Sequence, residues 1–485
     1  MENSRTNTLF KGMSTQTIIT VVMGVLEIVY FAIMSRLLSK TDFGYFAAIS
    51  GVMAICMSLS EAGLGSAVVQ KKDATEGHIS TAFTLSLSLG LVCSMIVFII
   101  SPWIANLVAD DTLTIPLRLM SSTIFLHSLI SVGNAILYRK LDFKRVGINS
   151  IIAYTLSCCV AIVMAYLGFG LFAIVSANIL NAVFLVILLY GFSVKAPRLK
   201  IHKDETKGIV SFGGWLTIGV VLNNISHQLD KLVLSKWLSV EALGMYNRPA
   251  GFISTINSKI NGIFDTVLFP MLSDMQNDRT KVTSVFFRAI SLLNSFSVIL
   301  AAIFFFNAEL IITIFFGGEW LDMVPVMRIA SLGVIFSIDS RLVDCFFRSL
   351  NFVKLGTQLR AIGVIITLTS LYIGAQHGII GVAWGILAAN LCLVLIKVVA
   401  LSIKVHAKIS LTFLAWMKAW KPAIIPAIIG CIYTLLPHTL LSNIVFAVIF
   451  GVVLIIEFVL YPQMVGKEYV ASVYPIVEKI KNRIL

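Results

Sequence analysis

Long uninterrupted apolar segments follow one another along almost the whole chain, and this feature restricts the possible folds more than any other. A bilayer core requires about 20 consecutive apolar residues per helix. Backbone polar groups in hydrocarbon must be satisfied within the spanning structure, so only helices and closed barrels can cross. The apolar runs are continuous, whereas the strands of a membrane barrel alternate apolar and polar residues. The sequence therefore predicts an all-α integral membrane protein.

The composition excludes a soluble fold of this length. Hydrophobic residues make up 58% of the 485 residues, charged residues make up 13%, and the mean hydropathy is +0.94. The pattern predicts about 14 transmembrane helices. We expect them near residues 15–38, 46–69, 82–104, 117–138, 147–167, 171–193, 209–235, 246–271, 284–306, 324–347, 356–375, 379–403, 420–437 and 443–463.

The charges of the connecting segments predict the orientation. If the N-terminus lies in the cytoplasm and the spans alternate, all loop Lys and Arg residues except Arg36, Lys40 and Lys236 fall on the cytoplasmic side. This asymmetry agrees with the positive-inside rule, and it predicts that both termini are cytoplasmic. Topology and anionic lipid headgroups account for the basic pI of about 9.4. No nucleic-acid partner is expected.

The second half of the sequence repeats the first. With a shift of 200, residues 35–39 (SRLLS) align with 235–239 (SKWLS), and Gly44, Phe46 and Gly51 align with Gly244, Tyr246 and Gly251. With a shift of 209, residues 141–147 (LDFKRVG) align with 350–356 (LNFVKLG). Such self-similarity indicates an internal repeat. We expect an N-terminal six-helix lobe (1–194), a cytoplasmic linker (195–207), a C-terminal six-helix lobe (208–404), and two additional helices with a cytoplasmic tail (405–485). Tight turns are expected at residues 168–170 and 374–378.

Ionisable residues inside the spans are the candidates for a functional site, because they are costly in hydrocarbon and must face a wet cavity or each other. The candidate substrate-binding cations, which would line a cationic cavity, are Arg248, Lys259, Arg341, Arg118 and Arg328. The candidate coupling or counter-ion acids are Glu27, Asp230, Asp265, Asp339 and Asp344.

Helical spacing leaves two interpretations of these charges open. Arg341, Asp344 and Arg348 share one stripe of the tenth span. They either pair with each other and fix helix packing, or form a cavity wall in which Asp344 orients two guanidinium groups for a phosphate. Glu27 either carries a proton during transport or is a buried counter-ion of Arg118.

The charges of the seventh and eighth spans also leave structural pairing and substrate binding open. Asp230 or Asp265 could pair with Lys259 or Arg248, or the two cations could bind substrate.

The sequence contains no Walker or dinucleotide-binding motif, and its seven cysteines are scattered without metal-ligand spacing. We therefore expect no catalytic residues, no metal and no cofactor. Coupling to protons or to sodium remains open.

Several local strings, in order and with matching spacing from about residue 38 to 325, resemble the polysaccharide-transporter family of Wzx-type flippases. They are residues 38–44 (LSKTDFG), 63–65 (GLG) followed by Val69 and Gln70, 139–147 (RKLDFKRVG), 212–216 (FGGWL), Asp230 with Lys231, 243–248 (LGMYNR), 269–273 (FPMLS), and 316–320 (FGGEW) with Pro325. The likeness is greatest to the branch of colanic-acid exporters and teichuronic-acid transporters. This branch belongs to the multidrug/oligosaccharidyl-lipid/polysaccharide exporter superfamily.

The resemblance implies two six-helix lobes arranged in a V and working by alternating access. It implies a flippase that moves an undecaprenyl-diphosphate-linked oligosaccharide from the inner to the outer leaflet of the bacterial inner membrane, for lipopolysaccharide O-antigen, capsule or exopolysaccharide biosynthesis. The partners it implies are this substrate and membrane lipids, with a polysaccharide polymerase and a chain-length regulator as further candidates.

Three alternatives have to be weighed against this interpretation. A drug/cation antiporter of the same superfamily would centre on acids, whereas interior cations outnumber acids here. A lipid II flippase would share the chemistry of a lipid diphosphate. A membrane glycosyltransferase or polymerase would need a large extramembrane loop or a catalytic carboxylate cluster, and the sequence has neither. The sequence therefore predicts a transporter rather than an enzyme.

Overall fold

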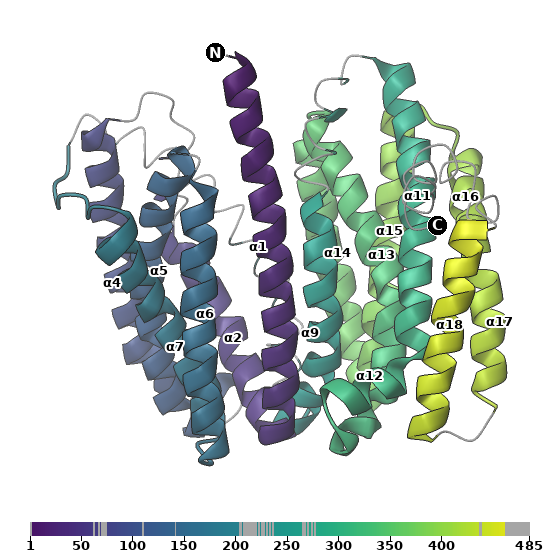
Figure 1. Cartoon of the computed structure of the whole chain (residues 1–485), viewed down its shortest axis with the longest axis horizontal. Helices are drawn as coiled ribbons and strands as arrows, with labels where there is room; N and C mark the ends of the chain where they lie inside the picture. Colours follow the sequence, from purple (N-terminus) through teal and green to yellow (C-terminus); the bar gives the residue numbers. More distant parts are fainter. Residues whose placement is uncertain are drawn as a thin grey trace. The chain divides into compact units, whose positions relative to one another are not determined.

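The computed structural model describes residues 2–61, 64–65, 68, 75–108, 111–140, 142–202, 206, 221, 224, 228, 231, 234, 237–263, 268, 271–272, 275, 278–435 and 439–460. Within these ranges it leaves out the side chains of residues 2–17, 61, 107–108, 259–263, 279 and 457–460. In the described part of the chain every regular element is a helix (Figure 1). The predicted all-α class is confirmed.

The chain forms two compact units, Met1–Asn247 and Arg248–Leu485. The elements of the first unit are α1 (Glu2–Leu37), α2 (Lys40–Glu61), α4 (Glu76–Val108), η1 (Asp111–Leu113), α5 (Thr114–Arg139), α6 (Phe143–Tyr166), α7 (Leu171–Leu188), its continuation η2 (Leu189–Ser193), and the first two turns of α9 (Val240–Ile263). In this unit α4 packs on α5, α6 on α7, and α5 on α7, while α1 lies against α6.

The second unit contains the remainder of α9 and the helices that follow it. They are α11 (Arg279–Phe306), α12 (Ala308–Phe315), η4 (Gly318–Met323), α13 (Val324–Ser349), α14 (Val353–Ala375), α15 (Gly378–Lys404), α16 (Ile409–Lys418), η5 (Lys421–Ala423), α17 (Ile424–Tyr433) and α18 (Leu440–Leu460). Here α11 packs on α13, α14 on α15, and α13 on α15. These three pairings repeat the pairings of α4 with α5, α6 with α7, and α5 with α7. The internal repeat predicted from the sequence is therefore present in the packing of each unit.

Hydrogen bonds at the starts of α2 and α9 also repeat. The Ser39 hydroxyl accepts from the backbone N–H of Asp42 at 3.2 Å, and the Asp42 carboxylate accepts from the Ser39 backbone N–H at 3.0 Å. This reciprocal arrangement is a capping box. At the aligned position, the Ser239 hydroxyl accepts from the backbone N–H of Ala242 at 3.1 Å. The aligned serines thus begin equivalent helices.

Immediately after these caps α2 and the first turns of α9, both in the first unit, approach closely. A Cβ atom on Gly44 would collide with the backbone carbonyl of Val240, and one on Gly244 would collide with the backbone carbonyl of Lys40. Lys40 and Val240 are aligned by the same shift of 200 as Gly44 and Gly244. Each contact is therefore the equivalent of the other in the second copy of the repeat. Glycine permits this approach because it has no side chain.

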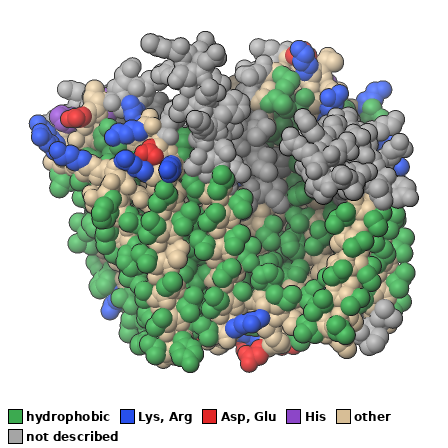
Figure 2. All heavy atoms as spheres, in the orientation of Figure 1, with side chains coloured by type: hydrophobic (Ala, Val, Ile, Leu, Met, Phe, Trp, Pro, Cys, Tyr) green, Lys and Arg blue, Asp and Glu red, His purple; other side chains and the backbone are tan. Residues whose placement is uncertain are grey.

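On the face that Figure 2 shows, apolar side chains cover most of the described surface, and Lys and Arg lie near its upper and lower edges. Ten helices in the described ranges are long and apolar enough to cross a membrane. The chain is therefore a multi-pass membrane protein. The predicted span at 209–235 lies outside the described residues apart from single positions, and the predicted lobe limits at 194–208 stay a prediction.

The turn glycines agree with the sequence interpretation. Gly168 has a φ of 86° between α6 and α7, and Gly378 has a φ of 70° between α14 and α15. Glycine adopts this left-handed region without steric cost. Both expected turns are confirmed.

One segment between two expected spans is helical. The expected spans 379–403 and 420–437 leave residues 404–419 as a connection, whereas α16 occupies 409–418 of this segment and packs on α11 and α15. In the structure Thr412 is buried, and the Trp416 ring lies 6.2 Å from that of Phe336.

The start of α11 lies outside the predicted membrane span. The Asp278 carboxylate accepts the backbone N–H of Lys281 at 3.1 Å and pairs with the Lys281 ammonium at 3.1 Å. The backbone hydrogen bond, together with the ammonium group, holds the pKa of Asp278 below its ordinary value. This exposed acid is therefore ionised at neutral pH.

Candidate functional site

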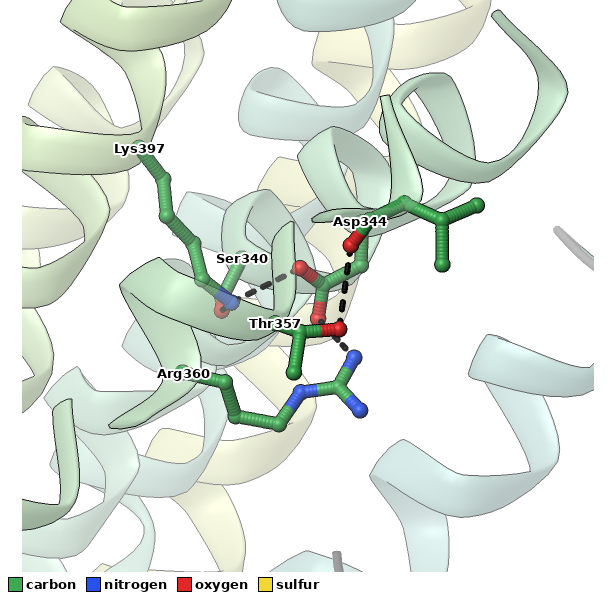
Figure 3. A network of polar contacts seen from close by, with 6 residues as sticks. Ser340, Asp344, Thr357, Arg360 and Lys397 are labelled. Carbon is green, nitrogen blue, oxygen red and sulfur yellow. Dashed lines mark hydrogen bonds and ion pairs between the residues drawn. The ribbon is translucent and has the colours of Figure 1, made fainter. Parts of the chain in front are cut away.

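A buried carboxylate with several cations around it lies where α13, α14 and α15 meet. Asp344 of α13 pairs with Lys397 of α15 at 2.9 Å and with Arg360 of α14 at 3.5 Å (Figure 3). The Lys397 ammonium also donates to the Ser340 hydroxyl at 2.8 Å. We call these four residues, together with Arg341, the Asp344 cluster.

Burial differs strongly among the cations of the cluster. The side chain of Lys397 is 3% exposed, that of Asp344 is 12% exposed and that of Arg360 is 38% exposed. Lys397 therefore forms a fixed, dry pair with Asp344. Arg360 reaches the same carboxylate from the solvent-accessible side.

Arg341 adds a third cation close to this pair. It lies within electrostatic range of Lys397, and its buried Nε has no hydrogen-bond partner in the described structure. Two cations thus pair with one carboxylate and a third lies near them, so the formal net charge of the cluster is positive. An unsatisfied buried donor is costly, and a polar or anionic ligand would satisfy it.

The cluster corrects the pairing considered from the sequence. The Arg341–Asp344–Arg348 pairing does not form, because Asp344 contacts Lys397 and Arg360 from other helices. Arg348 is exposed in the last turn of α13. Spacing along one helix correctly placed Arg341 and Asp344 near each other, but it gave the wrong partners.

Asp339 has no cationic partner among the described residues. Its two oxygens accept hydrogen bonds from Asn294 Nδ2 at 2.6 Å and from Trp416 Nε1 at 2.7 Å, and the residue is 1% exposed. These donors come from α11 and α16. Asp339 is therefore a separate buried group held by neutral donors.

Arg118 and Arg328 occupy similar positions near the starts of α5 and α13. Arg118 Nε donates to the Ser101 hydroxyl at 3.2 Å, and its guanidinium lies 5.2 Å from the Phe98 ring centre. The Arg328 guanidinium lies 6.0 Å from the ring centre of Phe305. Each arginine thus packs on an aromatic ring of the preceding long helix.

The proposed counter-ion pairing of Arg118 with Glu27 does not form. Arg118 contacts α4, whereas Glu27 lies on α1, partly buried and within electrostatic range of Tyr154 on α6. The two residues also lie at different levels of their helices. Glu27 is ten residues from the end of α1, which is about 15 Å along the helix, whereas Arg118 is in the first turns of α5.

The remaining predicted site residues are tested only in part. Arg248 is partly buried on α9. The side chain of Lys259 and the residues Asp230 and Asp265 lie outside the described residues. Their suggested pairings therefore stay predictions.

The sequence interpretation missed Lys397 and Arg360 as site residues. Lys397 is the one charged residue in the predicted span 379–403, which is otherwise apolar. A single cation in such a segment must find a partner inside the protein. This signal would have identified Lys397, although not its partner.

Among the described residues, no group of three or more His, Cys, Asp or Glu side chains could hold a metal ion. The charged and polar side chains of the Asp344 cluster can form ion pairs and hydrogen bonds with a ligand.

Comparisons with known proteins agree with this fold. A search of curated proteins finds the lipopolysaccharide biosynthesis protein WzxC of Escherichia coli (strain K12), 22% identical over 78% of this chain and 78% of that protein. It also finds the teichuronic acid biosynthesis protein TuaB of Bacillus subtilis (strain 168), 22% identical over 68% of each. Among solved structures, the lipid II flippase MurJ in an inward closed conformation matches with a TM-score of 0.72 and 16% identity, covering 91% of this chain and 98% of MurJ.

A family model described as "polysaccharide biosynthesis protein" matches residues 33–325, which is more than half of the chain. The match covers most of the first copy of the internal repeat and the first part of the second, and it includes all of the strings that suggested the family in the sequence. The chain belongs to this polysaccharide biosynthesis protein family.

Proposed function

We propose that the protein is a flippase that moves an oligosaccharide linked to a lipid diphosphate across the membrane by alternating access, for the biosynthesis of a surface polysaccharide. It is a transporter rather than an enzyme. The observation that carries the proposal is the Asp344 cluster, in which two cations pair with one carboxylate and a third cation lies near them among membrane-spanning helices.

Phosphate chemistry fits the cluster. A guanidinium group offers a planar set of donors that matches phosphate oxygens, often with two parallel hydrogen bonds. Arg360 is the accessible guanidinium, and Arg341 has a buried donor that needs an acceptor. The buried Lys397–Asp344 pair would form the base of the site and keep Arg360 in place. Arg341 and Arg360 would contact the diphosphate.

The relatives support the same substrate class. WzxC and TuaB are biosynthesis proteins of lipopolysaccharide and teichuronic acid, and MurJ is a flippase of lipid II. The names of the first two refer to the biosynthesis of a polysaccharide, and the name of the third refers to the flipping of a lipid-linked molecule. We further propose that the protein lies in the bacterial inner membrane with both termini in the cytoplasm, which is supported by the charge bias of the loops.

A drug/cation antiporter is the main competing function, because multidrug transporters share the fold. One such transporter matches with a TM-score of 0.63 and 16% identity. The net positive charge of the Asp344 cluster disfavours this alternative, since it would repel a cationic drug.

Replacing Arg341 and Arg360 singly by glutamine should lower the rate of flipping by about 10- to 100-fold each. Each change removes one charge-assisted hydrogen bond to phosphate, which is worth roughly 1.5–3 kcal/mol, and about 1.4 kcal/mol corresponds to tenfold. The measurement uses purified protein in proteoliposomes with undecaprenyl diphosphate carrying a short fluorescent oligosaccharide. A membrane-impermeant quencher reports how much of the probe has changed leaflet.

Lys354→Gln provides the matched control, because Lys354 lies on the same helix as Arg360 but is exposed at the helix start. It should flip the probe at the wild-type rate. Wild-type rates in both Arg341→Gln and Arg360→Gln would reject the cluster as the phosphate site. Equal transport of a neutral lipid-linked oligosaccharide by the wild type would reject the diphosphate as the recognised group.

A further inference from the structure

The Asp339 carboxyl group is buried, and no described residue supplies it with an opposite charge. It lies outside the cluster used in the proposed function. Its two hydrogen bonds come from Asn294 of α11 and Trp416 of α16, and both donors are neutral. An ionised carboxylate placed in this way loses its hydration and gains no opposite charge in return. A carboxyl group that carries a proton avoids this cost.

The charged and titratable groups on the elements packed around α13 and α16 do not contact Asp339. Lys397 and Arg360 are held by Asp344, and Glu309 by Asn443. Arg328 packs on Phe305, Lys404 on Phe352, and Lys281 pairs with Asp278. The others, apart from the partly buried Arg341, are exposed, namely Arg288, Glu319, Asp322, Arg348, Lys354, His377, His406, Lys408, Lys418 and Lys421. Within the described structure, only the two neutral donors bind this carboxyl group.

The site also holds an acceptor that a protonated carboxyl group could use. Asn294 is fully buried, and its Oδ1 atom has no hydrogen-bond partner in the described structure. The oxygen and nitrogen of an asparagine amide exchange places when the amide turns over. In the turned orientation Asn294 Oδ1 faces Asp339 and accepts the hydrogen bond of a protonated carboxyl group. The pair can therefore satisfy both the ionised and the protonated form.

We propose that Asp339 is a proton-binding site, and that its proton controls how firmly α16 docks on the second unit. A hydrogen bond from the Trp416 indole to a carboxylate is roughly twice as strong as one to a neutral carboxyl group. Loss of the proton therefore tightens the contact between α16 and α13, and uptake of the proton loosens it. Trp416 retains its ring contacts with Phe336, Phe413 and Trp420 in both states.

The hydrogen-bond donors Asn294 and Trp416 favour binding of a proton over binding of a sodium ion at Asp339. A hard metal cation requires several oxygen ligands around it. Here an N–H group points at each carboxylate oxygen, and the indole N–H cannot turn over to present an oxygen. The indole hydrogen would repel a cation at this position, whereas a proton adds to the carboxyl group itself.

The test uses the full-length protein in phosphatidylcholine bilayers and needs no transport substrate, so its outcome is separate from that of the proposed function. Infrared difference spectra on a pH step report the carbonyl stretch of protonated carboxyl groups. Hydrogen exchange, corrected for the intrinsic pH dependence of amides, reports the docking of residues 409–418. In the wild type the carboxyl band should appear as the pH falls, and exchange in α16 should rise about threefold to tenfold as a charge-assisted hydrogen bond becomes a neutral one.

Asp339→Asn should remove the component of the band that comes from Asp339, seen as the difference between the wild type and the variant, and make the exchange of α16 independent of pH. Trp416→Phe keeps the aromatic packing but lacks the N–H donor, so it should keep the band and lose the response of α16. Asp278→Asn, at an exposed acid, should behave as the wild type. If Asp339→Asn fails to fold, Trp416→Phe still tests the docking.

Three results would overturn the proposal. One is a titrating band of the same intensity in Asp339→Asn as in the wild type. Another is a response of α16 that persists in Trp416→Phe. The third is loss of the band at constant pH when sodium is added, because it would assign the site to sodium.

Discussion

Replacing Asp344 by alanine is expected to destabilise the protein by about 3–5 kcal/mol, the cost of leaving a buried charge without its partner. Lys397 is 3% exposed, and Asp344 is its only carboxylate partner in the described structure. The hydroxyl of Ser340 would remain at 2.8 Å, but a neutral acceptor does not compensate an ammonium group. The midpoint of thermal unfolding of the purified protein in detergent should fall accordingly.

A double-mutant cycle separates this charge effect from lost packing. Lys397→Met alone should cost less, because Asp344 keeps its pair with Arg360. Combining Asp344→Ala with Lys397→Met should recover most of the stability lost in Asp344→Ala, since no buried charge is then left alone. Additive losses in the double variant would show that the pair contributes nothing specific. Recovery of stability without recovery of flipping would assign Asp344 a second role in orienting Arg360.

Most of the fold could be predicted from the sequence, because the apolar runs are local and each helix satisfies its own backbone. The repeat could also be predicted, since similar strings at a shift of 200 produced the same serine caps at Ser39 and Ser239. The short helix α16 could not, because its burial depends on contacts with α11 and α15.

Only the positions of the candidate site residues along a single helix could be predicted from the sequence. The spacing of Arg341 and Asp344 is local, and it placed both in the same region of α13. The partners of Asp344 are set by tertiary packing, since Lys397 lies 53 residues away along the chain. The same holds for Asp339, whose donors lie 45 and 77 residues away. Charge placement finds candidate residues, whereas the packing of distant helices decides which of them pair.

The second large loss of stability is expected from substitutions where α2 crosses the first turns of α9. Replacing Gly44 by leucine should destabilise the protein by about 3 kcal/mol, the upper part of the usual range for overpacking. The new Cβ would collide with the backbone carbonyl of Val240, which cannot move aside as a flexible side chain would. Gly244→Leu should have a similar effect, because its Cβ would meet the carbonyl of Lys40.

Gly251→Leu is the matched control for this prediction. Gly251 lies two turns further along α9, and outside its own stretch of helix no heavy atom of the described structure lies within 4 Å of the position where its Cβ would be placed. The leucine should therefore change the unfolding midpoint little, whereas Gly44→Leu and Gly244→Leu should lower both the midpoint and the yield of monodisperse protein. If all three variants are equally stable, the close approach of the two repeats is not required for folding. If only one of the pair is sensitive, the contact does not follow the symmetry of the repeat.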